Sequence, residues 1–267
     1  RVSSKNIFYK NMAIKNQAIF IGLLLPVLLL LCMAIYAGFF KDFAFKIKYG
    51  SYSFFGTKEK MNAINVESIA KSKKDRTNVT VVIHGAGAEY YKDVYGTVIW
   101  LKEQGMNPIS FDYDFRESPD VSAGRLKKFI EETLLETGNE KVDILGICLG
   151  GMLAKYYAQE YGGASSIRKL VTIISPALVI PEKEPAYMYD KYFSFDPDPW
   201  NEILVKLENI NPVVDHLYLY CRKDLLVPSK YQRAEIGNYF GFDCGHAFIN
   251  TNPQLLQKAG EFLETRK

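Results

Sequence analysis

The residues with the clearest capacity for chemistry lie near the middle of the chain, around a single cysteine. Residues 142–153 read VDILGICLGGML, an apolar strand that runs into a glycine-flanked turn and then into an apolar helix. This order matches the nucleophile elbow G-x-S-x-G, with Cys148 in the serine position. The elbow is strained and brings backbone segments close together, which explains the flanking glycines. Cys148 is therefore the candidate nucleophile, because an inert buried cysteine requires no such turn.

A candidate base follows by elimination, since the chain has only three histidines. His84 follows an early predicted strand and His216 precedes a late one, whereas His246 follows the last predicted strand. Ligands of open α/β sheets bind at the carboxyl ends of the strands, which argues against His216. The chain order nucleophile, acid, histidine argues against His84, which lies far upstream, so His246 is the candidate base. Asp224 follows the penultimate strand and is the candidate acid that would orient the imidazole. Asp243, only three residues from the histidine, is the alternative acid.

A glycine-containing turn, HGAG at residues 84–87, directly follows the apolar run VTVVI. In proteins with this order of motifs, such a turn supplies one backbone N–H of an oxyanion hole, and the residue after the nucleophile supplies the other. The backbone amides of Ala86 and Leu149 are therefore the candidate oxyanion donors. The turn could also open a dinucleotide fingerprint, but Tyr90 occupies the place of the third glycine. No Walker loop, H-E-x-x-H or EF-hand pattern occurs, so we expect neither a cofactor nor a metal.

Strands and helices alternate along the chain at a spacing that predicts an α/β fold with a mostly parallel, doubly wound sheet. The predicted strands are residues 79–83, 107–111, 142–145, 169–174, 216–220 and 238–242, with two further short strands at 43–55 and 64–69. The predicted helices are residues 94–104, 118–137, 149–161, 229–236 and 253–265. The apolar face expected for helix 118–137 consists of Leu126, Phe129, Ile130, Leu134 and Leu135.

An uncharged segment precedes this alternating region. Ala18 to Phe40 contains 23 residues without a charge, enough to cross a bilayer core of roughly 30 Å. A cleaved signal segment is the alternative, although no small-x-small site stands at the expected place. We expect a basic flank at residues 1–17, a single-pass membrane anchor at 18–40 and a catalytic domain at 41–267. Lysines on both sides of the span leave the side of the membrane open.

A long irregular section, residues 176–212, interrupts the alternation and is rich in proline, aspartate and aromatic residues. Loops of this length inside a compact domain are often functional, so we expect a cap or lid, with a simple surface insertion as the alternative.

The amino-acid composition further limits the kind of protein and the partners that we expect. Hydrophobic residues make up 48% of the chain, charged residues 24%, and the net charge is +3. These values suit a globular protein with a substantial core, and the short basic runs predict no nucleic-acid partner. The four cysteines lack any C-x-x-C spacing. Cys221 and Cys244 lie at the ends of two late strands, where a disulfide is conceivable, but we expect two unpaired thiols.

The order of these motifs resembles the α/β-hydrolase superfamily over roughly residues 50 to 265. The HG turn is similar to that of lipases and esterases. The cysteine elbow GICLGG is similar to those of dienelactone hydrolases and polyhydroxyalkanoate synthases. The resemblance implies a Cys148–His246–Asp224 triad that cleaves carboxylic ester or thioester bonds through a covalent acyl-enzyme.

The expected function is thus a membrane-anchored hydrolase of lipophilic acyl substrates. Two alternatives remain open at this point. One is an acyltransferase that uses the same triad, and the other is a hydrolase-like module that binds a ligand without catalysis.

Overall fold

The computed structural model describes residues 41–49, 51–52, 55–87, 90–179, 198–207, 213–233, 237–246 and 252–264. The chain divides into two units, Arg1–Phe45 and Lys46–Lys267, and the sheet lies in the second. The predicted anchor at 18–40 falls outside the described residues. Among the residues that are described, no helix is both long enough and apolar enough to cross a membrane.

The core of the second unit is one six-stranded sheet with the strand order β2-β1-β3-β4-β5-β6. Its strands are β1 (Val79–Ile83), β2 (Asn107–Phe111), β3 (Val142–Ile147), β4 (Ile167–Ile173), β5 (Asp215–Cys221) and β6 (Asn238–Phe242). Every neighbouring pair is parallel. All residues of β1, β2 and β3 are buried, as expected for strands that carry helices on both faces. The predicted α/β class with a parallel sheet is confirmed.

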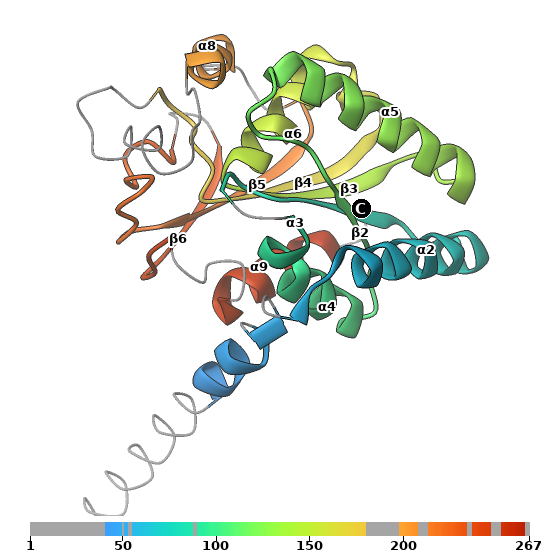
Figure 1. Ribbon diagram of the computed structural model, residues 1–267. Coiled ribbons are helices and arrows are strands. Elements are labelled where there is room, and N and C mark those ends of the chain that lie inside the picture. The colour runs from blue at the N-terminus through green and yellow to red at the C-terminus, as the bar shows by residue number, and fades with distance from the viewer. Residues whose placement is uncertain are drawn as a thin grey trace, which may run out of the picture. The chain divides into compact units, whose positions relative to one another are not determined.

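Helices cover both faces of the sheet, with α5 and α6 on one side and α2, α4 and α9 on the other (Figure 1). Their bounds are α2 (Lys58–Asp75), α3 (Tyr90–Asp93), α4 (Tyr95–Glu103), α5 (Pro119–Thr137), α6 (Leu149–Glu160), α8 (Asp198–Leu207) and α9 (Pro253–Glu264). A short 3₁₀ turn at Gly163–Ser165 joins α6 to β4. Because the strands are parallel, their carboxyl ends share one edge, and the loops that leave this edge can place side chains in a common site.

The two early strands predicted at 43–55 and 64–69 are wrong. Residues 41–49 are helical, and residues 64–69 lie inside α2. The side chain of Thr57 accepts a hydrogen bond from the Lys60 amide and so caps the start of α2. The buried positions Met61, Ile64, Ser68 and Ser72 then recur every three to four residues, which is the period of a helix and not of a strand.

Two smaller predictions also need correction. Leu135 of α5 is 87% exposed and points away from the core, whereas Leu126 and Ile130 are fully buried. The helix predicted at 229–236 does not form over its described part, because residues 229–233 are turns. Within the expected cap, residues 198–207 form α8, whose Trp200 is buried.

The expectation of two unpaired late cysteines is wrong. Cys221 and Cys244 form a disulfide with their Cα atoms 4.9 Å apart. Cys221 ends β5, Cys244 follows β6, and these two strands are neighbours, so both thiols leave the sheet at the same edge. Cys148 is buried and is not part of a disulfide.

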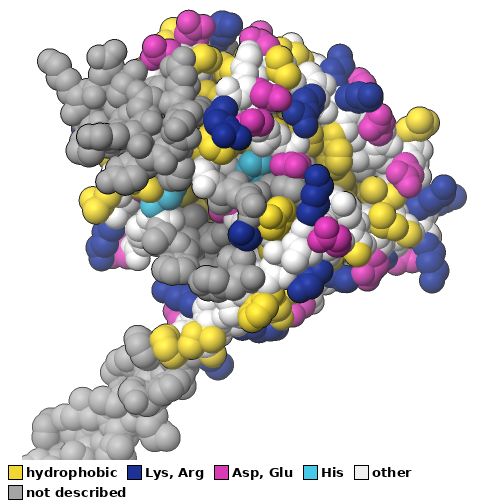
Figure 2. Space-filling view, in the orientation of Figure 1, with side chains coloured by type: hydrophobic (Ala, Val, Ile, Leu, Met, Phe, Trp, Pro, Cys, Tyr) yellow, Lys and Arg dark blue, Asp and Glu magenta, His cyan; other side chains and the backbone are white. Residues whose placement is uncertain are grey.

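The surface of the second unit carries charges of both signs. Lys and Arg side chains are interspersed with Asp and Glu side chains over the described part of the face in Figure 2. Several of them pair between elements, for example Lys102 with Glu67 at 2.6 Å and Lys48 with Glu103 at 2.7 Å. Exposed pairs of this kind contribute little to stability, about 0–1 kcal/mol each.

Candidate active site

Cys148 lies at a sharp turn between β3 and α6 and has the backbone angles φ 50° and ψ −118°. A positive φ is uncommon for a residue with a side chain and marks a strained position. The turn is fixed by hydrogen bonds, because the Cys148 amide donates to the Ile173 carbonyl of β4 at 2.8 Å and its carbonyl accepts from Gly151 at 3.0 Å. The side chain is 7% exposed. This is the strained strand-to-helix geometry expected of the elbow.

The glycines around Cys148 are required by close packing of the backbone. A Cβ atom on Gly146 would lie 2.6 Å from the Gly151 Cα atom. A Cβ atom on Gly150 would lie 2.4 Å from the His84 carbonyl oxygen and 2.5 Å from that of Ile83. The start of α6 therefore packs directly on the end of β1, which brings the HG turn beside the elbow.

Gly150→Ala should consequently lower the free energy of unfolding by about 1–3 kcal/mol or more. This is the usual cost of forcing extra atoms into a packed core. The obstructing atoms are backbone carbonyls, which cannot swing aside. Thermal unfolding monitored by circular dichroism measures the effect. The matched control is Gly124→Ala in α5, where a Cβ atom meets no heavy atom within 4 Å and should stabilise the helix by about 0.5–1 kcal/mol. Equal effects of the two substitutions would contradict this description of the elbow.

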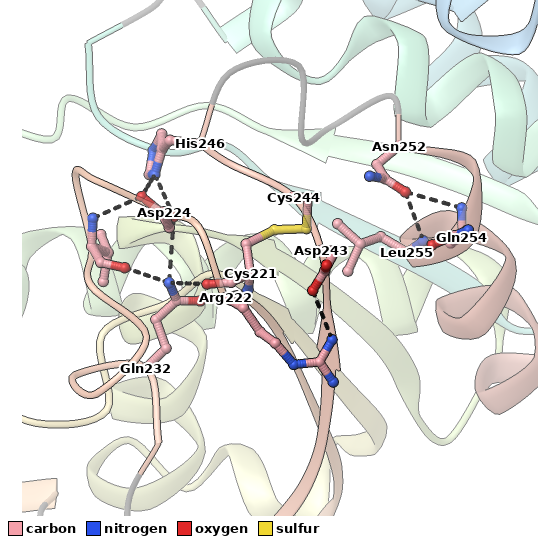
Figure 3. The surroundings of a disulfide bond; sticks show 11 residues. Cys221, Arg222, Asp224, Gln232, Asp243, Cys244, His246, Asn252, Gln254 and Leu255 are labelled. Carbon is pink, nitrogen blue, oxygen red and sulfur yellow. Dashed lines mark hydrogen bonds and ion pairs between the residues drawn. A yellow bond between two sulfur atoms is a disulfide. The ribbon is translucent and has the colours of Figure 1, made fainter. Parts of the chain in front are cut away.

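Asp224 and His246 are in contact beyond the ends of β5 and β6 (Figure 3). The Nδ1 atom of His246 lies 2.9 Å from Oδ2 and 3.1 Å from Oδ1 of Asp224. The Asp224 carboxylate is fully buried, and its Oδ1 accepts from the backbone amides of Leu226 and Val227, both at 2.9 Å. These bonds hold the carboxylate in place, with Oδ2 as the oxygen closer to the imidazole.

His246 also forms a hydrogen bond with Cys148. Because Nδ1 faces Asp224, the ring nitrogen available to the cysteine is Nε2. Burial lowers the pKa of His246, but the hydrogen bonds and charges of Asp224 and Cys148 outweigh it and raise the pKa to about 10. Sulfur, imidazole and carboxylate therefore stand in series at the carboxyl edge of the sheet.

This raised pKa predicts how stability changes with pH. The folded-state pKa of His246, about 10, exceeds the ordinary histidine value of about 6.5. Its contribution to stability is therefore fully present below about pH 6.5 and is lost as the pH rises through about 10. We expect the difference in Tm between the wild type and His246→Gln to shrink steadily over that interval. A difference that stays constant would show that the imidazole is not held as a cation.

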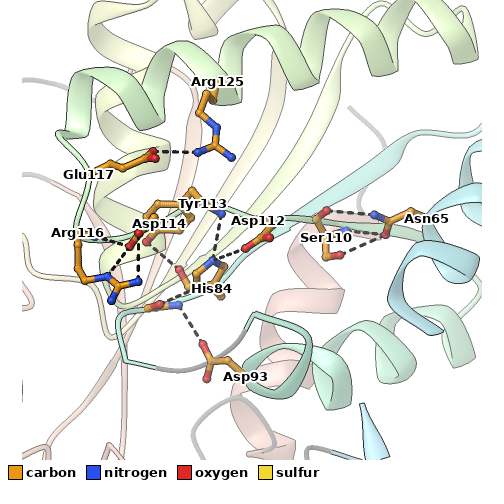
Figure 4. Close-up of polar contacts among 11 residues, drawn as sticks. Asn65, His84, Asp93, Ser110, Asp112, Tyr113, Asp114, Arg116, Glu117 and Arg125 are labelled. Atoms are coloured by element: carbon orange, nitrogen blue, oxygen red, sulfur yellow. Dashed lines mark hydrogen bonds and ion pairs between the residues drawn. The ribbon is translucent and has the colours of Figure 1, made fainter. Parts of the chain in front are cut away.

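The HG turn is anchored by hydrogen bonds to buried and partly buried groups (Figure 4). The Gly85 amide donates to Oδ2 of Asp93 at 3.0 Å, and the Tyr113 hydroxyl donates to the His84 carbonyl at 3.1 Å. A Cβ atom on Gly85 would lie 3.1 Å from the Cβ atom of Cys148, so the turn and the cysteine are neighbours. Burial, with the nearby Cys148 and Asp93, holds the pKa of Tyr113 well above its usual value, so its hydroxyl is a stable donor.

The two candidate oxyanion donors occupy the two segments that meet here. Leu149 is the first residue of α6, and Ala86 is a partly buried residue of the HG turn. An amide in the first turn of a helix has no partner within that helix and points toward the helix N-terminus, which favours negative charge there.

The remaining candidates lie elsewhere. Asp243 is exposed and pairs with Arg222 at 3.1 Å (Figure 3). It also pairs with Lys223 at 3.2 Å. His84 is buried, and burial lowers its pKa despite the nearby Asp93 and Asp112. His216 is buried inside β5, where its Nε2 lies 3.0 Å from the Thr172 hydroxyl. Among the described residues, no group of three His, Cys, Asp or Glu residues could hold a metal ion.

Sequence reasoning missed three residues that support this site. Asp93 and Tyr113 hold the HG turn, and Gln232 contacts both Asp224 and the backbone of Cys221. None of them lies in a motif, because each acts through a contact that exists only after the chain has folded.

Comparisons with known proteins agree with this architecture. The profile of a family described as the alpha/beta hydrolase fold matches residues 103–205, from the end of α4 through the elbow to α8. Lipase BlEst2 of Bacillus licheniformis, in its mature form, is similar in structure with a TM-score of 0.57 at 13% identity, covering 71% of this chain and 93% of that one. The product of the gene lin2722 of Listeria innocua has a TM-score of 0.52 at 18% identity, covering 72% and 95%. The Francisella virulence factor BioJ has a TM-score of 0.51 at 16% identity, covering 71% and 77%.

At these identities the solved structures show the fold, while the profile match runs through the segment that contains the elbow. The parallel sheet, the strained turn at Cys148 and both kinds of comparison lead to the same result. The chain has the α/β-hydrolase fold.

Proposed function

We propose that this protein hydrolyses carboxylic ester or thioester bonds, with Cys148 as nucleophile, His246 as general acid and base, and Asp224 as the acid that orients the imidazole. The observation that carries the proposal is the serial contact of Cys148, His246 and Asp224 at the carboxyl edge of the sheet. The α/β-hydrolase fold and the similarity to a protein named as a lipase support an ester-hydrolysing enzyme.

The proposed reaction has two halves. In the first, the Cys148 thiolate attacks the acyl carbonyl carbon, and the imidazolium of His246 gives its proton to the departing alcohol or thiol. This leaves a thioester acyl-enzyme. In the second half, His246 takes a proton from water, the hydroxide attacks the thioester, and the carboxylic acid leaves as the thiolate re-forms.

The negative charge that develops on the carbonyl oxygen would rest on the backbone amides of Ala86 and Leu149. The closeness of Gly85 to Cys148 supports this assignment, as does the position of Leu149 at the N-terminus of α6. Losing one donor of this kind typically lowers the rate by about 10²–10³-fold.

The proposal includes attachment to a membrane through residues 18–40, which suits a lipophilic acyl substrate. The Cys221–Cys244 disulfide supports a catalytic unit on an oxidising side of that membrane, because structural disulfides are rare in reducing compartments. Alkaline carbonate extraction of membranes, combined with protease protection of sealed vesicles, tests both points. Release by carbonate, or digestion of the catalytic unit in sealed vesicles whose lumen is the oxidising side, would contradict them.

A substrate panel tests the proposed reaction itself. The purified full chain is assayed with p-nitrophenyl esters and acyl-CoA thioesters of short and long acyl groups, and the free acid is measured as product. We expect hydrolysis that increases with acyl length, and heat-denatured protein provides the blank. Absence of turnover across the panel would contradict an ester- or thioester-hydrolysing enzyme. Formation of a new ester in place of the acid, with added alcohol, would indicate acyl transfer instead.

A further inference from the structure

The acid and the histidine of the site stand on two loops that a disulfide joins directly. Cys221 lies three residues before Asp224, and Cys244 lies two residues before His246. The backbone between the loops is also bonded, because the Arg222 amide donates to the Phe242 carbonyl at 2.9 Å and the Lys223 amide donates to the Cys244 carbonyl at 3.1 Å. Cys244 is thus tied to the β5 loop both through its sulfur and through its carbonyl oxygen.

Gln232 connects the same disulfide to the carboxylate (Figure 3). Its side chain is 2% exposed, and its Oε1 accepts from the Cys221 amide at 3.2 Å. Its Nε2 donates to the Val227 carbonyl and lies 3.4 Å from Oδ2 of Asp224. That oxygen is the one closest to His246. One buried amide group therefore links the half of the disulfide on β5 to the carboxylate oxygen that faces the imidazole.

We propose that Cys221, Cys244 and Gln232 form a positioning clamp that sets the separation of Asp224 and His246. None of the three touches a reacting atom, and each acts through the loops that carry the acid and the histidine. The clamp rests on the proposed function, since positioning matters only if Asp224 and His246 are catalytic. It adds the claim that the efficiency of the site depends on an intact disulfide.

A disulfide that only stabilises the fold would behave differently from a clamp. Loss of a disulfide that only stabilises the fold lowers Tm. It leaves the contact between Asp224 and His246 unchanged in the molecules that remain folded. Loss of the clamp separates the two loops in the folded protein. The titration of His246 distinguishes these cases, because the groups that raise its pKa are Asp224 and Cys148.

The experiment compares the full chain in detergent with two disruptive variants, Cys221→Ser/Cys244→Ser and Gln232→Leu. Ile130→Ala, at a fully buried position of α5, is the control for destabilisation without contact with the clamp. Imidazole resonances are followed by NMR as a function of pH. The chain has three histidines, and burial lowers the pKa of both His84 and His216, so His246 is distinguished by titrating far above them.

We expect the His246 pKa to fall by about 1–3 units in both clamp variants, the usual effect of losing an adjacent opposite charge, and to stay near the wild-type value in Ile130→Ala. We also expect kcat to fall about 10²-fold with little change in KM, the scale of a small misplacement of catalytic groups. Clamp variants with a lower Tm but wild-type titration and kcat would overturn the proposal and leave the disulfide with a stabilising role only. If the wild type hydrolyses nothing, the titration still reports on the contact, so failure of the clamp and failure of the proposed reaction can be told apart.

Reduction provides an independent arm of the test. Dithiothreitol passes two electrons and two protons to the Cys221–Cys244 disulfide, giving two thiols, and closes to its own cyclic disulfide. Wild-type kcat should fall toward that of the double-serine variant, which dithiothreitol should leave unchanged. A wild type that keeps full activity after mass spectrometry has shown complete reduction would contradict the clamp.

Discussion

Replacing Cys148 by alanine should lower kcat about 10⁶-fold, the scale on which removing the nucleophile of a hydrolase triad acts. The reason is that no other nucleophile takes its place at the elbow. Cys148 alone occupies the turn, with φ at 50°, and it forms the hydrogen bond with His246. Initial rates on the best ester of the substrate panel measure the change.

Cys148→Ser is the matched comparison, because it keeps a nucleophilic atom at the same place. We expect its activity to lie between those of the wild type and the alanine variant. A hydroxyl needs full deprotonation by His246, whereas a thiol reaches the anionic form more readily. Thermal unfolding should show that all three proteins are folded. An alanine variant with near wild-type rates would mean that the elbow is catalytically silent and would favour a binding module.

Asp224→Asn should lower kcat about 10⁴-fold while leaving the fold intact, as loss of the triad acid does in other hydrolases. The amide can still accept from the Leu226 and Val227 backbone, but it cannot stabilise an imidazolium. It also presents a donor toward His246 Nδ1, which holds the ring in the wrong tautomer for taking a proton at Nε2.

Asp243→Asn is the control for this substitution. Asp243 belongs to the same loop as His246, yet its carboxylate is 63% exposed and pairs with Arg222 and Lys223. We expect a change in kcat of less than about threefold, since exposed ion pairs contribute about 0–1 kcal/mol. If the two substitutions had equal effects, the assignment of Asp224 would be wrong.

The parallel sheet could be predicted from the sequence because short, mostly apolar segments alternate with longer helical ones. The bounds of β1, β2 and β6 match the predicted ones, and each of these strands ends on a β-branched or aromatic residue, Ile83, Phe111 or Phe242. The strand predicted at residues 64–69 was wrong because the pattern of the sequence and the burial in the fold differ there. Their alternation of apolar and polar residues suits a strand, but burial follows the helical spacing of Met61, Ile64 and Ser68, which depends on how α2 packs on the sheet.

The site could be predicted in part, because the order of motifs places three residues at strand ends. The sequence also placed Cys221 and Cys244 at strand ends, but a disulfide requires a short distance in space, which follows only from the pairing of β5 with β6. Gln232 was predicted to lie in a helix. It lies instead in a turn that directs its amide inward, toward Asp224 and the Cys221 backbone.

The most direct test of the central claim is to trap the acyl group on Cys148. The full chain is mixed with a p-nitrophenyl ester, quenched in acid within the first turnover, digested and examined by mass spectrometry. The account predicts an acyl mass on the peptide that contains Cys148, and its disappearance as the free acid forms. Ester turnover at full rate without any adduct on Cys148, or with the adduct on another residue, would contradict it.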